Sequence, residues 1–212
     1  VRVPSHQAYR QVTAGLPGRQ SNGYTFTVGD HQIDVVAFGE IEDDERRVPW
    51  NEDQWNVLGF EESLAAALPV RLAPDLSCRV APLTALCALK VLAFDDRHPA
   101  TVKDAPDLAL LLKAHEDGGL LESDDRGLFE RALEATDYSW SLASAYYLGA
   151  GLAQTIGVPT WTAVVAVLQR EDRRFTLLGL MGTAVAANEE RLEQYLRGAL
   201  EHPPEDPPAR DD

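Results

Sequence analysis

The segment ALKVLAFDDRHPATVKDAPDLALLL (88–112) contains two apolar runs typical of buried helices, and charged residues interrupt both. The first run carries Lys90 in its middle and ends at Arg97. Seven residues make two helical turns, so the two cations are expected on one side of the helix. The second run opens with Asp104 and Asp107. A lysine within one apolar helix and two acids at the start of the next need a physical explanation.

Lys90 has two interpretations. A lysine that emerges from a helix beside a cleft can reach a phosphate as a point charge. The alternative, more common when the residue is taken alone, is a lysine that lies along a partly buried helix and extends its ammonium group to water. The apolar face predicted for this helix consists of Leu83, Leu86, Leu89 and Ala93.

The acids of DAPD fit a helix start without any function. Asp104 is predicted as the N-cap, Pro106 lies in the first turn, and Asp107 lies near the positive end of the helix. Lys103 and Asp107 can also form a surface pair worth about 0.3 kcal/mol. A role at a phosphate site would be additional to capping.

Outward from this segment, the chain changes character near residue 82. Residues 5–16 are predicted as a short amphipathic helix with Ser5 as N-cap, and 24–28 and 32–38 as the strands of a hairpin. The other predictions before residue 82 are a loop over 40–56, a helix within 57–68 and one or two strands over 69–81. The predicted helices after it are 82–94, 105–116, 125–134, 138–155, 160–170 and 187–200, with 174–182 undecided.

This order of elements predicts an α+β fold, with a small mixed or antiparallel sheet followed by a C-terminal helical bundle. The expected parts are a sheet-containing part over 1–81, a helical part over 82–202 and a disordered tail over 203–212. The tail is rich in proline and acids, which cannot bury enough apolar surface to fold.

Composition limits the function. The 212 residues carry a net charge of −15, of which the tail from Glu201 contributes −4 and the stretch 40–53 contributes −5. Broad binding to a phosphate backbone is therefore disfavoured. A local basic cleft remains open, with candidates Arg2, Arg10, Arg19, Lys90, Arg97 and Lys103.

Localisation is predicted from the same features. No apolar run approaches the roughly 18 residues of a membrane span, so a cytoplasmic protein without membrane contact is expected. Cys78 and Cys87 are too few for a disulfide framework and are predicted to be reduced, packed thiols.

Asp34 lies within the second predicted strand, where aspartate is uncommon. A strand carboxylate beside a cleft can bind a hard cation such as Mg²⁺. The alternative is a residue that faces solvent on an edge strand. The five histidines form no metal motif, and the Gly-Ala-Gly of 149–151 indicates close helix packing rather than phosphate binding.

Three segments in this order resemble the AbiEii/AbiGii-type nucleotidyltransferases of the DNA polymerase β-like superfamily: QIDVVAFGEIED (32–43), LTALCALKVLAFDDR (83–97) and KDAPDLALLL (103–112). The resemblance implies that Asp34 is the third carboxylate for Mg²⁺. It also implies that Lys90, with Arg97 beside it, contacts the phosphates of a nucleoside triphosphate, and that Asp104 or Asp107 is the acidic partner.

The activity that the resemblance implies is transfer of a nucleoside monophosphate from a nucleoside triphosphate to an acceptor such as RNA. The implied setting is toxin-like, with an antitoxin-like protein as a partner.

The sequence departs from that family at its beginning. The family's Gly-Ser helix start and Asp-x-Asp strand are absent, the chain starts at Val1, and its only methionine is Met181. We expect that the front of the domain is missing and that the chain as written is inactive or impaired, because two-metal transfer needs those carboxylates. The alternative is a degenerate, non-catalytic relative that acts as a binding or regulatory module.

Overall fold

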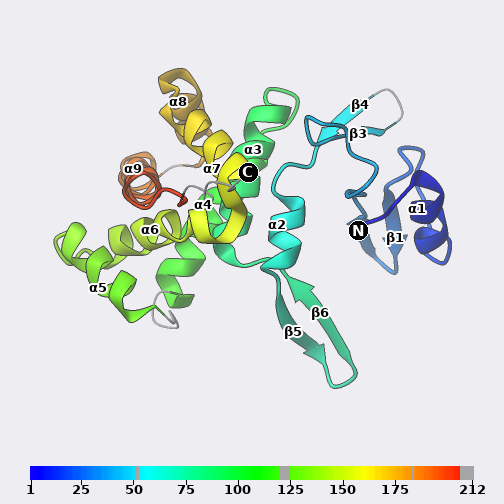
Figure 1. Cartoon of the computed structure of the whole chain (residues 1–212), viewed down its shortest axis with the longest axis horizontal. Helices are drawn as coiled ribbons and strands as arrows, with labels where there is room; N and C mark the ends of the chain where they lie inside the picture. Colours follow the sequence, from blue (N-terminus) through cyan, green and yellow to red (C-terminus); the bar gives the residue numbers. More distant parts are fainter. Residues whose placement is uncertain (51–52, 120–124, 183, 206–212) are drawn as a thin grey trace, which may run out of the picture. The chain divides into compact units, whose positions relative to one another are not determined.

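The computed structural model of the chain describes residues 1–50, 53–119, 125–182 and 184–205. It divides into two compact units, Val1–Glu61 and Glu62–Asp212. Helices and small antiparallel sheets are both present, so the α+β class is confirmed (Figure 1). The single sheet that the sequence predicts is not found. The described strands form three separate two-stranded antiparallel sheets, because each strand pairs only with its neighbour in sequence.

The first unit begins with helix α1 (His6–Thr13). The Ser5 side chain accepts a hydrogen bond from the Ala8 backbone N–H at 3.1 Å, which confirms the predicted N-cap. The buried residues of the helix, Tyr9 and Thr13, are one turn apart and define its inner face.

Strands β1 (Thr25–Val28) and β2 (His31–Asp34) form the predicted hairpin. Strand β2 ends at Asp34 and does not continue to residue 38 as predicted. Phe38 instead makes an isolated parallel bridge to Arg2, so backbone pairing with the N-terminal segment replaces the end of the strand.

A second hairpin, β3 (Arg47–Trp50) and β4 (Asp53–Asn56), lies in the stretch predicted as loop. Val48 and Trp50 are buried, whereas Pro49 between them is exposed. This alternation of buried and exposed residues is typical of a strand. It was not recognised in the sequence because the surrounding stretch is rich in acids.

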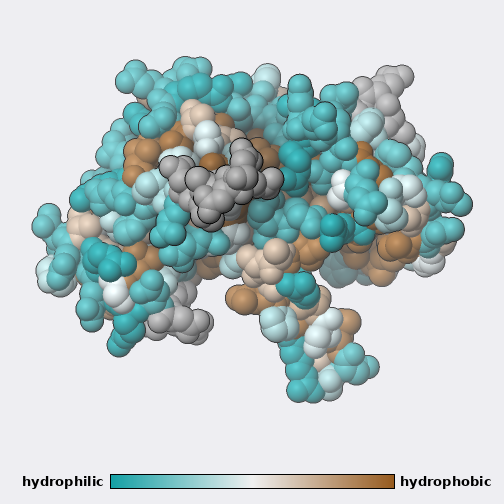
Figure 2. Space-filling model, in the orientation of Figure 1, coloured by the Kyte–Doolittle hydropathy of each residue, from teal (hydrophilic) through white to brown (hydrophobic). Residues whose placement is uncertain are grey.

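Helix α2 (Phe60–Ala65) contains the division between the units. The hairpin of β5 (Leu68–Ala73) and β6 (Leu76–Val80) follows it and confirms the strands predicted there. This hairpin extends from the helices of the second unit, and its surface carries apolar patches among hydrophilic residues (Figures 1 and 2). Its exposed apolar side chains are Leu68, Val70, Leu72, Leu76 and Val80.

Every described element after Val80 is helical, as predicted, and together these helices form the body of the second unit. They are α3 (Leu83–Arg97), α4 (Asp104–Ala114), the π-helical turn η1 (His115–Gly119), α5 (Arg126–Ala135), α6 (Trp140–Ala150), α7 (Leu152–Gln169), α8 (Glu171–Leu180) and α9 (Val185–Glu201).

The division of the chain between residues 138 and 170 differs from the prediction. The helix predicted over 138–155 is divided at Gly151, and α7 then continues through a kink at Gly157, whose φ is 66°. Only glycine adopts this conformation without strain, so the glycine at this position favours the break. The undecided segment 174–182 belongs mostly to α8.

Helix α7 is long and apolar enough to span a membrane by length and composition, contrary to the expectation that no run approaches that length. It packs against α3 and α9 inside the second unit. Core helices of soluble proteins meet the same criterion, so this helix carries no conclusion about localisation. The tail predicted over 203–212 falls mostly outside the described residues, which end at 205.

Candidate functional site

The candidate site lies where the end of helix α3 meets the beginning of α4. Lys90 and Arg97 come from α3, and Asp104 and Asp107 come from the first turn of α4. The two helices are joined by six residues and pack against each other. The structure therefore brings together the four charged residues that the sequence singled out in this segment.

The distances show a connected ion-pair cluster. Lys90 Nζ lies 2.6 Å from Asp107 Oδ2 and 3.3 Å from Asp104 Oδ1. Arg97 Nη2 lies 2.6 Å from the same Oδ1 of Asp104. Both cations thus donate to one carboxylate oxygen, and Asp107 holds the other side of the ammonium group. The four formal charges sum to zero.

Burial differs sharply within this Lys90 cluster. The Asp104 side chain is 1% exposed, whereas Lys90 is 27%, Arg97 43% and Asp107 45% exposed. A buried carboxylate is costly unless cations and hydrogen bonds compensate it. Asp104 Oδ2 is buried without a hydrogen-bond partner among the described residues. The cluster therefore has a buried anionic centre and three members that solvent can reach.

The predicted N-cap role of Asp104 is wrong. Helix α4 begins at Asp104, and Lys103, which precedes it, has helical φ and ψ and makes no side-chain cap. The Asp104 carboxylate is directed to Lys90 and Arg97 instead, because two cations compensate a buried charge better than one backbone N–H. The ion pair of Asp107 is likewise formed with Lys90, rather than with the predicted Lys103.

Two carboxylates hold the ammonium group of Lys90, and its side chain is 27% exposed, so the choice between its two interpretations stays a prediction. The apolar face predicted for its helix is only half-buried. The deeply buried residues are Ala85, Cys87, Ala88, Val91, Leu92 and Phe94. Helix α3 packs against both α4 and α7, so it buries more than one face.

Asp34 lies in the first compact unit, at the end of β2. Its residue is exposed, and its Oδ1 accepts a hydrogen bond of 2.6 Å from the Thr25 hydroxyl on the paired strand. The Thr25 hydroxyl in turn accepts from the Asn22 amide at 2.9 Å. These bonds close the base of the hairpin, which is a structural task. Convergence of Asp34 with the Lys90 cluster stays a prediction.

The Mg²⁺ implied by the resemblance finds a poor fit in these residues. In the part of the chain that the structure describes, no three acidic, histidine or cysteine side chains gather as a metal group. Asp34 offers one carboxylate that already accepts a hydrogen bond.

Sequence reasoning missed a second polar cluster in the helical unit. Glu116 of η1 accepts hydrogen bonds from Arg191 Nη2 at 2.6 Å, from Ser141 Oγ at 2.8 Å and from Lys113 Nζ at 3.0 Å. Burial raises the pKa of the Glu116 carboxyl, but these hydrogen bonds together outweigh burial and hold that pKa below its ordinary value. The cluster ties α4, α6 and α9 to one carboxylate. No local pattern predicts the partners Ser141 and Arg191, which lie 25 and 75 residues from Glu116 in the sequence.

His115, which precedes Glu116 in the sequence, forms a hydrogen bond with Ser144. Its Nδ1 lies 2.7 Å from Ser144 Oγ, and both residues are buried. Burial lowers the pKa of His115 to about 4, so the ring is neutral at physiological pH. A serine and a histidine in contact resemble a nucleophile and its base, but their burial leaves no access for a substrate.

No protein-family model, curated protein sequence or solved structure matches this chain. The family resemblance therefore stays a prediction that depends on its three motifs.

Proposed function

We propose that this chain is a nucleotidyltransferase-like protein of the AbiEii/AbiGii type that binds the phosphates of a nucleoside triphosphate at Lys90. The observation that carries the proposal is the Lys90 cluster itself. The motif residues of α3 and α4 lie together around one buried carboxylate, and the Lys90 side chain is 27% exposed. Transfer of a nucleoside monophosphate to an acceptor such as RNA, in a cytoplasmic toxin-like setting with an antitoxin-like partner, belongs to the same proposal.

The physical argument concerns which partner of Lys90 can be exchanged. Asp104 is buried and also held by Arg97, so a ligand from solvent displaces it from Lys90 less readily than it displaces Asp107. Asp107 is 45% exposed and lies on the solvent side of the ammonium group. A phosphate oxygen that approaches from solvent can replace the Asp107 carboxylate, because it offers a similar charge and acceptor geometry. Arg97, also exposed, can then contact a second phosphate oxygen.

The test is one of binding, because the described residues hold no metal group and the sequence carries no Asp-x-Asp strand. Mg²⁺ enters with the nucleotide, since it is commonly held by substrate phosphates and few protein carboxylates. Titration calorimetry with each Mg²⁺–nucleoside triphosphate should show binding. Lys90→Ala should weaken that binding by about tenfold or more, which is the usual value of a charge-assisted contact.

Lys113→Ala is the matched control. Lys113 is also a helical lysine that pairs with two acids, Glu116 and Asp117, and its loss should leave the affinity unchanged. Asp107→Asn adds a second test that does not depend on removing the cation. In the absence of Mg²⁺ it should tighten nucleotide binding, because a neutral amide competes less for the ammonium group than a carboxylate does.

A second function follows from a specific observation, the exact neutrality of the cluster's formal charges. If Lys90→Ala and Asp107→Asn both leave nucleotide binding unchanged, the cluster only fastens α3 to α4. The chain is then the non-catalytic binding or regulatory module, and the transferase proposal is wrong.

A further inference from the structure

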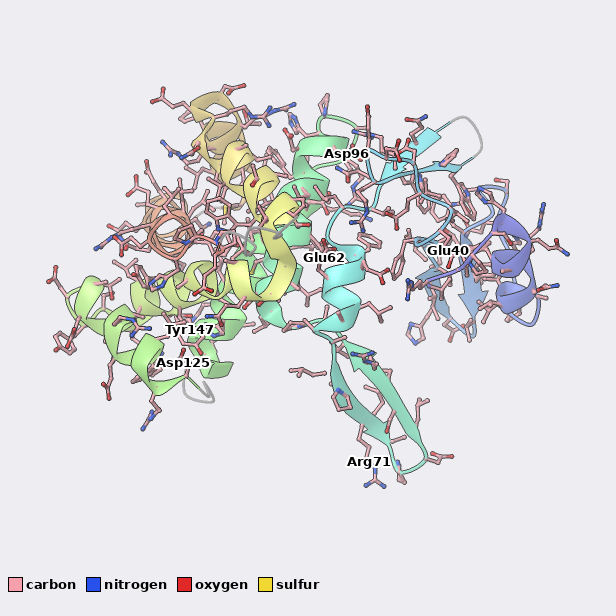
Figure 3. The ribbon with its side chains drawn as sticks, viewed as in Figure 1. Glu40, Glu62, Arg71, Asp96, Asp125 and Tyr147 are labelled. Atoms are coloured by element: carbon pink, nitrogen blue, oxygen red, sulfur yellow. The ribbon has the colours of Figure 1, made fainter. Side chains whose placement is uncertain are left out.

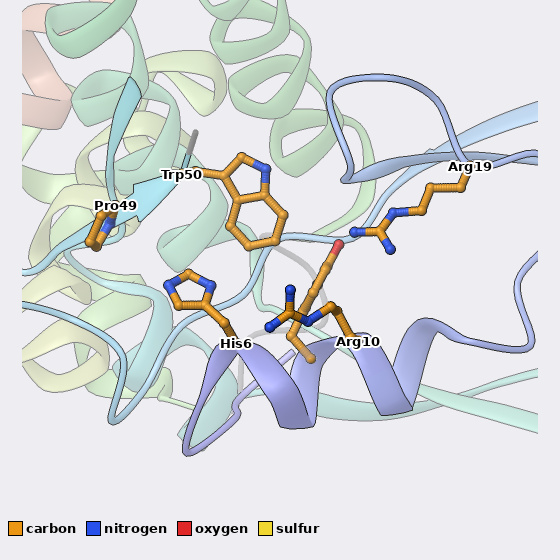
Figure 4. A pocket seen from close by; sticks show the side chains of 6 residues that line it. His6, Arg10, Arg19, Pro49 and Trp50 are labelled. Atoms are coloured by element: carbon orange, nitrogen blue, oxygen red, sulfur yellow. The ribbon is translucent and has the colours of Figure 1, made fainter. Parts of the chain in front are cut away.

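The first unit contains a hollow of about 350 Å³ that the proposed function does not use. Its lining comes from α1, the segment after it and β3, and all of these belong to the first unit. The lining residues are His6, Tyr9, Arg10, Arg19, Pro49 and Trp50 (Figure 4). Among the described residues that line it, none is acidic, although the whole chain has 34 acids against 19 lysines and arginines.

The floor of this hollow is aromatic and fixed. Tyr9 and Trp50 are buried, with ring centroids 4.7 Å apart in an edge-to-face arrangement. The Tyr9 hydroxyl donates to the Val35 carbonyl at 2.8 Å, and Trp50 Nε1 donates to the Asn22 carbonyl at 2.9 Å. Backbone carbonyls thus satisfy the polar atoms of both rings. Tyr9 is 1% and Trp50 7% exposed, and the Trp55 ring stacks on Trp50 at 5.5 Å, so the two rings form a closed floor and offer a ligand little ring face.

The rim adds a third ring and two cations. The His6 ring is exposed and lies 5.7 Å from the Trp50 ring, tilted by 52°. The guanidinium groups of Arg10 and Arg19 point into the hollow (Figure 4). Arg19 Nε donates to the Gly23 carbonyl at 3.2 Å, and its guanidinium group lies 6.0 Å from the centroid of the Phe26 ring; both contacts orient this side chain. Arg10 forms no hydrogen bond, ion pair or ring contact with any described residue.

We propose that this hollow binds one nucleotide, with its phosphate on Arg10 and Arg19 and its base against the exposed ring of His6. Arginine offers phosphate a bidentate, permanently charged contact. Aromatic side chains are the usual platforms on which unpaired bases stack. The volume lies at the small end of the range for ligand pockets, which suits a single nucleotide.

The nucleotide has two sources with the same chemistry. It is either a free nucleoside monophosphate or the terminal nucleotide of a nucleic acid strand. The site does not depend on the proposed function, because none of its residues belongs to the Lys90 cluster. The local basic cleft that the composition left open thus forms from Arg10 and Arg19 in the first unit.

The experiment measures binding of adenosine monophosphate, adenosine and inorganic phosphate to the full chain by calorimetry. Adenosine monophosphate should bind more tightly than either of the other two, since it alone engages both the His6 ring and the cations. Arg10→Ala and Arg19→Ala should each weaken its binding by roughly tenfold, the usual effect of losing a charged hydrogen bond. His6→Ala should weaken the binding of adenosine as well.

Two controls separate this site from others. Arg71→Ala removes the same charge from an exposed position near the turn of the β5–β6 hairpin and should change nothing (Figure 3). Arg10→Ala made in a Lys90→Ala background should lose the same factor in affinity as Arg10→Ala alone, because the two sites share no residue, so failure of the proposed function does not affect this result. A short single strand with a terminal phosphate provides the second arm. Tighter binding than the free nucleotide assigns the strand end as the source, and equal or weaker binding assigns the free nucleotide.

Two results would overturn the proposal. One is equal affinity of wild type and both arginine variants for adenosine monophosphate. The other is equal affinity of the wild type for adenosine and adenosine monophosphate. Melting temperatures should not change in either arginine variant, because both side chains are exposed.

Discussion

Replacing Gly149 with alanine should destabilise the helical unit, because α6 and α9 touch at this residue through their backbones. A Cβ atom on Gly149 would lie 1.9 Å from the Tyr195 carbonyl oxygen and 3.0 Å from the Ala199 backbone nitrogen. Gly198 makes the reciprocal contact from α9, with its Cβ position 2.2 Å from the Tyr146 carbonyl oxygen. Neither obstacle is a flexible side chain, so the helices themselves must separate.

The expected magnitude follows from these distances. Nonbonded carbon and oxygen atoms need roughly 3.5 Å, so the helices have to separate by more than about 1 Å. Overpacking of a core costs about 1–3 kcal/mol, and a backbone obstacle places this case at the upper end. The preference of alanine over glycine in a helix offsets about 1 kcal/mol. The net loss is about 2 kcal/mol, equivalent to a melting temperature lower by roughly 4–8 °C.

Urea denaturation followed by circular dichroism measures this loss, and Gly179→Ala is its control. Gly179 lies in α8, where an added Cβ would meet nothing within 4 Å. The same substitution should therefore stabilise the protein by about 0.5–1 kcal/mol through helix propensity. The two variants are expected to differ in sign. If Gly149→Ala is as stable as Gly179→Ala, the two helices are not in backbone contact and the packing described for this unit is wrong.

Three further predictions concern buried groups. Asp104→Asn should lower the free energy of unfolding, measured in urea, by about 2–3 kcal/mol. This is less than the loss of a fully buried ion pair would cost, because Lys90 keeps access to water. An unchanged free energy of unfolding would contradict the conclusion that the two cations compensate the Asp104 charge. Because the folded pKa of His115 is about 4 and its ordinary value is 6.5, the unfolded chain binds more protons as the pH falls between these values. His115 should therefore cost about 1 kcal/mol of stability between about pH 7 and about pH 5.5, and His115→Gln should remove that part of the pH dependence. Burial raises the pKa of Cys87 to about 12, so a thiol reagent should modify Cys78 in the native protein and reach Cys87 only after denaturation; rapid reaction of both thiols would contradict the burial of α3.

Much of the local structure was predictable, because it depends on residues a few positions apart. Ser5 as a cap, the hairpin of β1 and β2 and the helical character after residue 82 all follow from short-range patterns. The close-packing role inferred for the Gly-Ala-Gly segment is confirmed at Gly149. The β3–β4 hairpin escaped prediction, since only the alternation of Val48 and Trp50 marks it within an acidic stretch.

The candidate site divides in the same way. The sequence placed Lys90 and Arg97 on one side of a helix and two acids at the start of the next, because both statements need only helical periodicity. The sequence could not show that Asp104 forms an ion pair instead of a cap. The first turn of α4 offers backbone N–H groups to a capping side chain whether or not a cation is near. Packing of α3 against α4 decided between them by burying that carboxylate against two cations.

By itself the sequence determined which segments are helical, which charged residues are candidates for a site and where small residues allow close helix packing. Each of these depends on residues within one or two helical turns of each other. Only the tertiary structure decided which charges meet and which rings and arginines share a hollow. Lys90 finds its partners 14 and 17 residues away, and Trp50 lies beside Tyr9 of a different element. Such contacts depend on how helices and hairpins pack, which is set by the sum of many burial energies rather than by any local pattern.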